Sequence, residues 1–256
     1  MTTNNSTLIF DDQASVKGRS IIITGGTEGI GRAITLLLAK CGANVLISGQ
    51  DEEHLNETLQ QARDLQVEGT VESIIADMST DDGVTELFAM ADKKFGSLDV
   101  LINNAAVSYQ GVTEGNYDDI EFIIRTNLLG YLACAKEAIK RMQPQKQGHI
   151  INIGSMSADV REKDSSVYVT TKSGIQGFSE SLRKEMNELG IKVTLIEPGA
   201  VGTDMQPVSK DEEKEKQENL EMLKAEDIAR AVLYALTQPA RCDVVDIKIR
   251  PHLQLI

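Results

Sequence analysis

Short runs of apolar, often β-branched residues recur along the chain, and stretches with helical periodicity separate them. The runs lie at positions 21–23, 45–47, 74–75, 100–102, 150–151, 193–196 and 244–249. Most of these runs are apolar without alternation, which is typical of strands covered on both faces of a sheet. Strands that alternate with helices favour a parallel sheet with helices on both sides. The pattern therefore predicts an α/β fold, with one doubly wound parallel sheet of about seven strands flanked by helices.

Two of the helical stretches carry a long apolar stripe. The first stripe comprises Ile120, Ile123, Ile124, Leu128, Tyr131, Leu132, Ala135 and Ile139, and the second comprises Ile175, Phe178, Leu182, Met186 and Leu189. This spacing places the apolar side chains on one face of each helix, where they can pack against the sheet. Gly190 follows the second stripe and is expected to cap that helix, since glycine readily adopts the left-handed backbone conformation.

One segment departs from the alternation of strands and helices. Residues 210–227 read KDEEKEKQENLEMLKAED. So many charges predict an exposed helix, and the position after a Pro-Gly turn also suits a mobile cover over a site. We expect one domain over residues 1–256, with residues 204–227 as a mobile substrate lid within it.

Composition and charge narrow the classes of partner. The 256 residues are 41% hydrophobic and 25% charged, with a net charge of -13. This excess of acidic residues argues against nucleic acid or an anionic membrane as a partner. Residues 1–17 lack the basic start and apolar stretch of a secretion signal, and no apolar run approaches the roughly 20 residues of a membrane span. These features predict a cytoplasmic protein.

Cysteines and histidines are few and scattered. The three cysteines are at positions 41, 134 and 242, and the three histidines are at 54, 149 and 252. Neither set has the spacing of metal ligands, and an odd number of dispersed cysteines does not suggest a disulfide framework. We therefore expect a reduced, intracellular protein without a structural metal.

A glycine-rich turn follows the first predicted strand. The segment TGGTEGIG at 24–31 joins residues 21–23 to a helix that begins near Ile30. Glycines in such a turn let the chain bend tightly and let a pyrophosphate approach the backbone, while the helix N-terminus offers its positive end to the phosphates. The position between a strand and an amphipathic helix favours a nucleotide site over an ordinary turn.

A tyrosine and a lysine are spaced for proton chemistry. Tyr168 and Lys172 are four residues apart, and Ser155 lies thirteen positions before Tyr168. On a helix, residues four apart share one face. An ammonium beside a phenol favours the phenolate and is expected to lower the pKa of Tyr168. The pair on its own could also be two residues that share a helix by chance.

These features together resemble the short-chain dehydrogenase/reductase family, from about Lys17 to Pro251. The matching elements are TGGTEGIG at 24–31, Asp77 after the third strand, NNAA at 103–106, Asn127 in a helix, Ser155, Tyr168 with Lys172, and Pro198-Gly199 followed by Thr203. They occur in the family's order and at its spacing. The resemblance implies a Rossmann fold and hydride transfer between a nicotinamide cofactor and a carbonyl or secondary alcohol.

The resemblance also implies a role for each catalytic residue. Tyr168 is the general acid or base, and Lys172 lowers its pKa and hydrogen-bonds the nicotinamide ribose. Ser155 holds the substrate oxygen close to the Tyr168 hydroxyl. Asn127 organises a water that relays protons from Lys172, although an asparagine in a helix can also be purely structural.

Cofactor contacts are inferred from the same resemblance. The expected set, in addition to Tyr168 and Lys172, is Gly25, Thr27, Glu28, Gly29, Ile30, Gly31, Gln50, Asp77, Met78, Asn104, Ala105, Pro198, Gly199, Val201 and Thr203. NAD-preferring members usually carry Asp at the position of Gly49, and NADP-preferring members often carry Arg at the position of Gln50. This chain has neither signature, and Ser48 and Gln50 can hydrogen-bond either cofactor. Because the carboxylates of Glu28 and Asp51 would repel a 2′-phosphate, the residues favour NAD weakly over NADP.

Two positions depart from the family pattern. Ala106 stands where the family commonly has Gly, and Gly154 stands where it commonly has a second Ser. Neither change removes a polar group from the expected chemistry. They concern backbone packing near the nicotinamide.

Substrate identity is only bounded by the sequence. The residues expected to line the pocket are Val107, Tyr109, Met156, Ser157 and Met205. They are apolar to mildly polar, and only Arg161 offers a cation from a nearby loop. This set favours a neutral ketone, aldehyde or secondary alcohol.

Two alternatives to an active dehydrogenase stay open. One is a catalytically idle nucleotide-binding protein that acts as a redox sensor or scaffold, against which the intact Ser155, Tyr168 and Lys172 argue. The other is an epimerase or dehydratase of the longer related family, which the short chain and the form of the glycine turn disfavour. The resemblance implies a homodimer or homotetramer paired through the helices around 117–142 and 166–189.

Overall fold

The protein folds around one parallel sheet of seven strands in the order β3-β2-β1-β4-β5-β6-β7. The structure, a computed structural model, describes residues 15–109, 111–203 and 209–254. The strands are β1 (Ser20–Thr24), β2 (Asn44–Gly49), β3 (Thr70–Ile75), β4 (Val100–Asn103), β5 (Gly148–Ile153), β6 (Ile191–Pro198) and β7 (Asp246–Ile249). Each strand is parallel to its neighbours. The predicted doubly wound sheet is confirmed.

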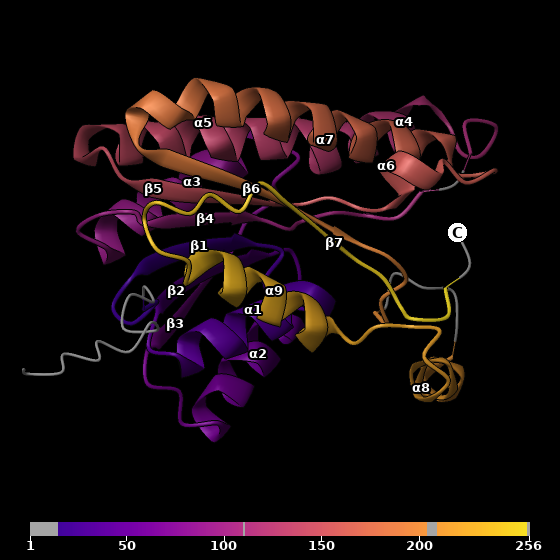
Figure 1. The fold of residues 1–256 in the computed structure, drawn as a ribbon, viewed down its shortest axis with the longest axis horizontal. Coiled ribbons are helices and arrows are strands. Elements are labelled where there is room, and N and C mark those ends of the chain that lie inside the picture. The colour runs from indigo at the N-terminus through magenta and orange to yellow at the C-terminus, as the bar shows by residue number, and fades with distance from the viewer. Residues whose placement is uncertain (1–14, 110, 204–208, 255–256) are drawn as a thin grey trace, which may run out of the picture.

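Helices cover both faces of the sheet (Figure 1). They are α1 (Gly29–Lys40), α2 (Glu52–Asp64), α3 (Asp81–Lys94), α4 (Tyr117–Ile124), α5 (Gly130–Met142), α6 (Ser157–Val160), α7 (Ser166–Met186), α8 (Lys210–Glu218) and α9 (Ala225–Leu236). Helices α1, α2 and α9 lie on one face, and α3, α5 and α7 lie on the other.

The two-sided cover explains why the strands read as continuous apolar runs. Ile21 and Ile23 of β1 pack into the core on the α1 and α9 side, whereas Ile22 packs into the core with α3 and α5. All three are fully buried. Successive side chains of a strand point to opposite faces, so a strand covered on both faces needs an apolar residue at every position.

Six of the seven strands extend beyond the apolar runs that predicted them, and the seventh is shorter than its run. The third strand is longer than residues 74–75, because its exposed edge position tolerates the polar residues of Thr70–Ile75. The seventh begins at Asp246 rather than at 244, although the carbonyls of Val244 and Val245 still accept hydrogen bonds from Thr194 and Leu195 of β6.

The helices predicted around 117–142 and 166–189 are both present. A π-helical segment, η1 (Arg125–Leu129), joins α4 to α5 and carries Asn127. Helix α7 continues into a 3₁₀ turn, η3 (Asn187–Leu189), which Gly190 closes with a φ of 71°, as expected for a capping glycine. A second 3₁₀ turn, η2 (Gln143–Gln145), follows α5. Within the described residues, none of the helices combines the length and the apolar character that crossing a membrane requires.

Helix α8 matches the exposed helix predicted for the charged segment. None of its residues is buried, and the Ser209 hydroxyl caps it by accepting a hydrogen bond from the Glu212 amide at 3.2 Å. Met205 and the rest of residues 204–208 lie outside the described residues, so the substrate lid stays a prediction.

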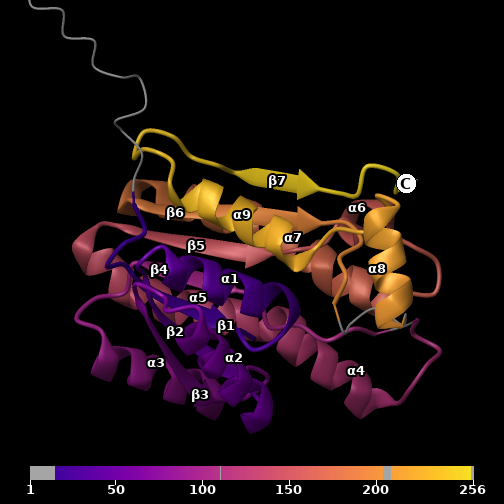
Figure 2. The same ribbon diagram turned by 90° about the horizontal axis from the view of Figure 1, so that it is seen from below.

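Strand order positions the functional end of the molecule. The chain moves outward in opposite directions from β1 and β4, which pair directly, and a doubly wound sheet binds ligands where its strand order reverses. The strands point toward the end where α4, α6 and α8 lie (Figure 2). Residues that follow β1, β4, β5 and β6 therefore meet at one edge.

A buried histidine on β5 makes stability depend on pH. His149 Nε2 lies 2.8 Å from the Thr194 hydroxyl, which itself donates to the Val244 carbonyl. Because the Thr194 hydroxyl proton is donated to that carbonyl, the Thr194 oxygen accepts the proton of His149 Nε2. Burial lowers the pKa of His149 to about 3, and the nearby charges of Lys192 and Arg19 act in the same direction.

We predict that acidification destabilises the fold through His149. The unfolded imidazole takes up a proton below about pH 6.5, whereas the folded one stays neutral down to about pH 3. This contribution to stability is complete above pH 6.5 and falls by about 2 kcal/mol between pH 7 and pH 5. Urea unfolding of His149→Gln should show a smaller loss over that range than wild type, whereas the exposed His252→Gln should behave like wild type. Equal losses in His149→Gln and wild type would refute the assignment.

Candidate active site

The glycine turn after β1 leaves no room for side chains. Gly25 and Gly29 have φ values of 63° and 46°, in the left-handed region that favours glycine. A Cβ on Gly31 would lie 1.9 Å from the Gly25 carbonyl oxygen, and one on Gly25 would lie 2.8 Å from Ala105 Cα. The backbone of the turn is therefore exposed to any ligand that enters the cleft beside it.

Helix α1 begins directly at this turn. Glu28 occupies its N-cap position, but the carboxylate makes no hydrogen bond to the first amide groups of the helix. The free N–H groups and the positive end of the helix dipole are the features that bind phosphate at helix N-termini.

Thr24 and Asn104 fix the turn against the neighbouring strand. The Thr24 hydroxyl accepts hydrogen bonds from the amides of Asn104 and Ala105 at 3.0 and 3.1 Å. In return, Asn104 Nδ2 donates to the carbonyls of Thr24 and Gly25 at 3.1 and 2.8 Å. These bonds give the TGG and NNA motifs a joint structural function, because they hold the ends of β1 and β4 together.

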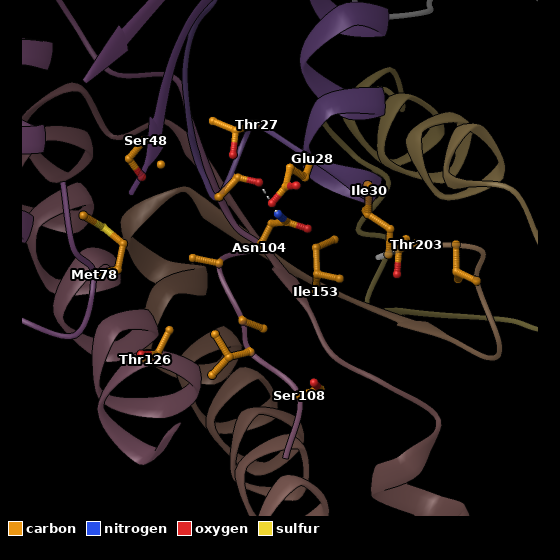
Figure 3. Close-up of a pocket in the computed structure, with 18 of the residues that line it drawn as sticks. Thr27, Glu28, Ile30, Ser48, Met78, Asn104, Ser108, Thr126, Ile153 and Thr203 are labelled. Carbon is orange, nitrogen blue, oxygen red and sulfur yellow. Dashed lines mark hydrogen bonds between the residues drawn. The ribbon is translucent and has the colours of Figure 1, made fainter. Parts of the chain in front are cut away.

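A cleft of about 620 Å³ runs along this edge of the sheet (Figure 3). Ser48 and Met78 lie at one end of it and Thr203 at the other, with Asn104 between them. The predicted site residues in its wall are Gly25, Thr27, Glu28, Gly29, Ile30, Gly31, Gln50, Met78, Asn104, Ala105, Ser155, Tyr168, Lys172, Pro198, Gly199, Val201 and Thr203. The structure thus brings together most residues that the sequence places in one site.

Asp77 and Asn127 do not line the cleft. Asp77 Oδ1 accepts hydrogen bonds from Gln50 Nε2 and from the Ser79 amide, both at 2.8 Å. Asp77 therefore positions Gln50 at the cleft wall. The predicted contact of Asp77 with an adenine stays a prediction.

Asn127 holds a loop of the site through the backbone. Its Oδ1 accepts from the Val107 amide and its Nδ2 donates to the Val107 carbonyl, each at 2.8 Å. The residue is fully buried in the π-helical segment, where the local widening of the helix directs it toward this loop. The two hydrogen bonds to Val107 give Asn127 a structural role, which the sequence had left open. The proton relay through water stays a prediction.

Lys172 carries a buried ammonium. Its Nζ donates to the Ile153 carbonyl at 3.0 Å and lies 5.7 Å from the ring centroids of both Tyr131 and Tyr168. The residue is 2% exposed. Burial lowers the pKa of Lys172 to about 8, because the charged form loses hydration. Most of the group still carries a proton at pH 7.

Tyr168 does not have the lowered pKa expected from the sequence. Burial raises the pKa of Tyr168, the hydrogen bond with Ser155 opposes this, and the charge of Glu162 adds to the increase. The expectation that Lys172 governs this pKa is thus wrong for this structure, because loss of hydration outweighs the other effects. The phenol is protonated at neutral pH and can act as an acid.

Ser155 is held between two backbone hydrogen bonds to β6. The Gly154 amide donates to the Ile196 carbonyl at 2.8 Å, and the Met156 amide donates to the Pro198 carbonyl at 2.9 Å. The serine therefore extends the β5–β6 pairing beyond the strand, which restricts the position of its hydroxyl beside Tyr168.

The departure at Gly154 has a packing explanation. A Cβ on Gly154 would lie 3.0 Å from Leu195 Cδ1 and 3.2 Å from Glu197 Cγ. The buried Glu197 side chain fills the space that a serine here would need. The change concerns packing against β6 and leaves Ser155 in place.

Within the part of the chain that the structure describes, two residues of the cleft carry buried hydroxyls without a hydrogen-bond partner. Ser48 Oγ and Thr126 Oγ1 belong to residues that are 1% and 4% exposed. Both residues line the cleft. A buried polar group of this kind normally has a partner, so the two hydroxyls fit a polar ligand such as a dinucleotide. The sequence already indicates Ser48 as a residue that can hydrogen-bond a cofactor, whereas the signal for Thr126 is weak, being its position next to Asn127.

The expected substrate residues are only partly in the cleft. Val107 lines it, with Ser108 beside it. The Tyr109 hydroxyl donates to the Glu114 carbonyl at 2.7 Å, and the Arg161 Nε donates to the Ala158 carbonyl at 3.3 Å. Arg161 is thus engaged with its own loop, and neither Met156 nor Ser157 belongs to the cleft wall.

We predict that Gly31→Ala abolishes nucleotide binding. The added methyl would meet the Gly25 carbonyl at 1.9 Å, so the turn must open. The Kd for NADPH, followed by fluorescence, should rise at least about 100-fold. Gly177→Ala in α7 is the control, because a Cβ there meets nothing within 4 Å. Unchanged affinity in a Gly31→Ala protein with native circular dichroism would contradict the prediction.

Comparison with known proteins identifies the family. Residues 19–214 match the short chain dehydrogenase family. An uncharacterized oxidoreductase of Staphylococcus aureus (strain MRSA252) is 36% identical over 231 residues, which cover 90% of this chain and 96% of that protein.

Solved structures agree with this match. A short-chain dehydrogenase/reductase from Serratia marcescens has a TM-score of 0.82 at 26% identity, covering 94% of this chain and 100% of that one. A metagenomic short-chain oxidoreductase in complex with NADP has a TM-score of 0.80 at 26% identity, with coverage of 94% and 100%. The weak preference for NAD expected from the sequence has no support among these findings. The chain belongs to the short-chain dehydrogenase/reductase family of oxidoreductases.

Proposed function

We propose that the protein is an NADP(H)-dependent oxidoreductase that interconverts a carbonyl compound and a secondary alcohol. The observation that carries the proposal is the convergence of Ser155, Tyr168 and the buried ammonium of Lys172 in one cleft with the glycine turn. A structural tyrosine–lysine pair would not require a phosphate-binding turn in the same cleft.

Different residues of the cleft would have different roles in such a reaction. A bound nicotinamide nucleotide supplies or accepts the hydride. The N-terminus of α1 would hold the diphosphate of this nucleotide. The two hydroxyls of Ser48 and Thr126, which have no partner among the described residues, would form hydrogen bonds with polar groups of the ligand. Ser155 and Tyr168 would hold the substrate oxygen between their hydroxyls, so that the carbonyl is polarised before the proton moves.

The protonated form of Tyr168 suits the role of the acid when a carbonyl is reduced. Because burial raises the pKa of Tyr168, its hydroxyl keeps a proton to donate to the oxygen of the substrate. Lys172, whose pKa is lowered to about 8, lies on the same face of α7 and can return a proton to the site. The relay through Asn127 would complete the path to solvent.

The geometry near β2 supports NADP(H) over NAD(H). A Cβ on Gly49 would lie 2.5 Å from Thr27 Cγ2, so the aspartate typical of NAD-binding relatives has no room in this packing. Asp51 lines the cleft, but its carboxylate caps α2, where it accepts from two backbone amides. Glu28 Oε1 lies 3.1 Å from His54 Nδ1, so the Glu28 carboxylate is paired with an imidazole of α2.

The proposals for the oligomeric state and for a substrate lid rest on the family and not on the cleft residues. We infer a homodimer or homotetramer through the helices predicted for that contact, since Phe122, Ile124, Leu129 and Leu132 expose apolar surface there. Residues 204–227 would cover the substrate.

The first test is a carbonyl panel with both cofactors and a single substitution. Tyr168→Phe removes the donor hydroxyl, so kcat for reduction should fall by about 10²–10⁴. The Kd for NADPH should change by less than about threefold, because the phenyl ring still fills the site. Tyr109→Phe is the matched control, since its hydroxyl contacts the Glu114 carbonyl and is not in the cleft wall.

Two outcomes would count against the proposal. Full activity in Tyr168→Phe would remove the tyrosine from the chemistry. A wild type that binds NADPH but turns over no ketone, aldehyde or alcohol would support a nucleotide-binding sensor instead.

Coenzyme choice has its own test, with two substitutions of opposite expected sign. His54→Ala removes the partner that holds the Glu28 carboxylate, which can then face a 2′-phosphate, so the Kd for NADPH should rise about tenfold. Glu28→Gln removes the repulsion and should lower it. The Kd for NADH should change less than about twofold in both, as that cofactor lacks the phosphate. A wild type that prefers NADH tenfold would overturn the NADP(H) proposal.

A further inference from the structure

A carboxylate lies close to the catalytic serine. The loop 161–165 connects α6, which follows Ser155, to α7, which carries Tyr168, and Glu162 lies on it. The Ser157 hydroxyl donates to Glu162 Oε1 at 3.2 Å, and the Ser157 amide donates to Ser155 Oγ at 3.1 Å. The carboxylate is therefore two hydrogen bonds away from the hydroxyl that would hold the substrate oxygen.

The loop that carries Glu162 has a defined shape. Arg161 and Asp164 both have left-handed backbone, with φ values of 56° and 62°. The Ser166 hydroxyl at the start of α7 accepts from the Val112 amide at 3.0 Å, which joins this loop to the segment after β4. A Cβ on Gly111 would lie 3.6 Å from Asp164, in ordinary contact. The loop that carries Glu162 is thus held to the segment after β4, which also contains the cleft residues Val107 and Ser108.

No cation neutralises Glu162 within the described part of the chain. Arg161 donates through Nε to the Ala158 carbonyl, and Lys163 pairs with Asp164 at 3.7 Å. Lys172 is buried against the Ile153 carbonyl. The negative charge therefore acts on whatever approaches Ser155.

The charge also reaches the catalytic tyrosine. Glu162 contributes to the raised pKa of Tyr168, after the larger effect of burial. A charge that acts on the Tyr168 phenol also acts on a substrate whose oxygen lies between Tyr168 and Ser155.

We propose that Glu162 selects substrates by charge, favouring uncharged or cationic carbonyl compounds and disfavouring those with a carboxylate next to the carbonyl. The proposal rests on the proposed function, since it places the reacting oxygen at Ser155 and Tyr168. A substrate carboxylate on the carbonyl carbon or on the next carbon would then lie near Ser155, which is two hydrogen bonds from the Glu162 carboxylate. The two negative charges would repel each other. Because Glu162 is exposed, water and salt weaken this repulsion, and we expect discrimination of about tenfold at low ionic strength.

A purely structural role for Glu162 is separable from a charge role. Glutamine at this position keeps an oxygen that accepts the Ser157 hydrogen bond but removes the charge. Glu162→Gln therefore changes electrostatics with little change in packing. Asp164→Asn is the matched control, because that carboxylate in the same loop already faces Lys163 and its asparagine tolerates left-handed backbone.

The experiment compares esters with the corresponding acids. We would measure kcat/KM with NADPH for ethyl pyruvate against pyruvate and for ethyl acetoacetate against acetoacetate. Wild type should favour the esters, and Glu162→Gln should raise kcat/KM for the acids about tenfold while the esters change by less than about twofold. Added 0.5 M NaCl should reduce the preference of wild type, and Asp164→Asn should keep it.

The outcomes separate this inference from the function on which it rests. If wild type reduces the esters but Glu162→Gln leaves the ester-to-acid ratio unchanged, charge selection by Glu162 is wrong and the oxidoreductase proposal stands. If wild type reduces neither esters nor any other carbonyl compound, the proposed function itself fails, and the inference fails with it.

Discussion

A single ammonium group in the interior constrains the rest of the site. Nζ of Lys172 is enclosed between the rings of Tyr131 and Tyr168 and bonded to the carbonyl of Ile153. Burying a charge is costly unless its hydrogen bonds are satisfied. The carbonyl that satisfies it belongs to the last residue of β5, which also accepts the Tyr131 hydroxyl at 3.1 Å. The charge therefore ties α5, α7 and β5 together at the point where Ser155 follows.

A ladder of buried amides keeps these elements in register. Asn103 Nδ2 donates to Asn152 Oδ1 at 2.9 Å, and Asn152 Nδ2 donates to the Ser179 hydroxyl at 2.9 Å. The ladder runs from β4 through β5 to α7, all within the core. Among the described residues Asn103 Oδ1 has no partner, but both Nδ2 groups of the ladder are paired, and a shift of one element would break these buried bonds. Together with the bonds between Thr24 and Asn104, they fix Ser155, Tyr168 and Lys172 relative to the glycine turn.

Sequence reasoning predicted the sheet and most of the cleft for a physical reason. Continuous apolar strands such as Ile21–Ile23 report burial on both faces, and the motifs sit at strand ends that a parallel sheet must bring together. It could not predict the raised pKa of Tyr168, because hydration of a phenol depends on side chains that are distant in sequence. It also could not show that Asp77 and Asn127 serve the cleft through Gln50 and Val107, since hydrogen-bond partners are set by tertiary contacts. Thr126 could not be recognised from the sequence, because a buried hydroxyl has no periodic signature.

In the proposed reaction the protein would donate a proton beside the buried Lys172 ammonium, and the cleft would hold a nicotinamide nucleotide. The most direct test is transfer of deuterium from NADPH deuterated at both C4 positions to a neutral ketone. We expect an alcohol with one deuterium on the carbinol carbon, detected by mass spectrometry. An alcohol without deuterium, or firm binding of NADPH with no alcohol formed from any ketone, would contradict the proposal.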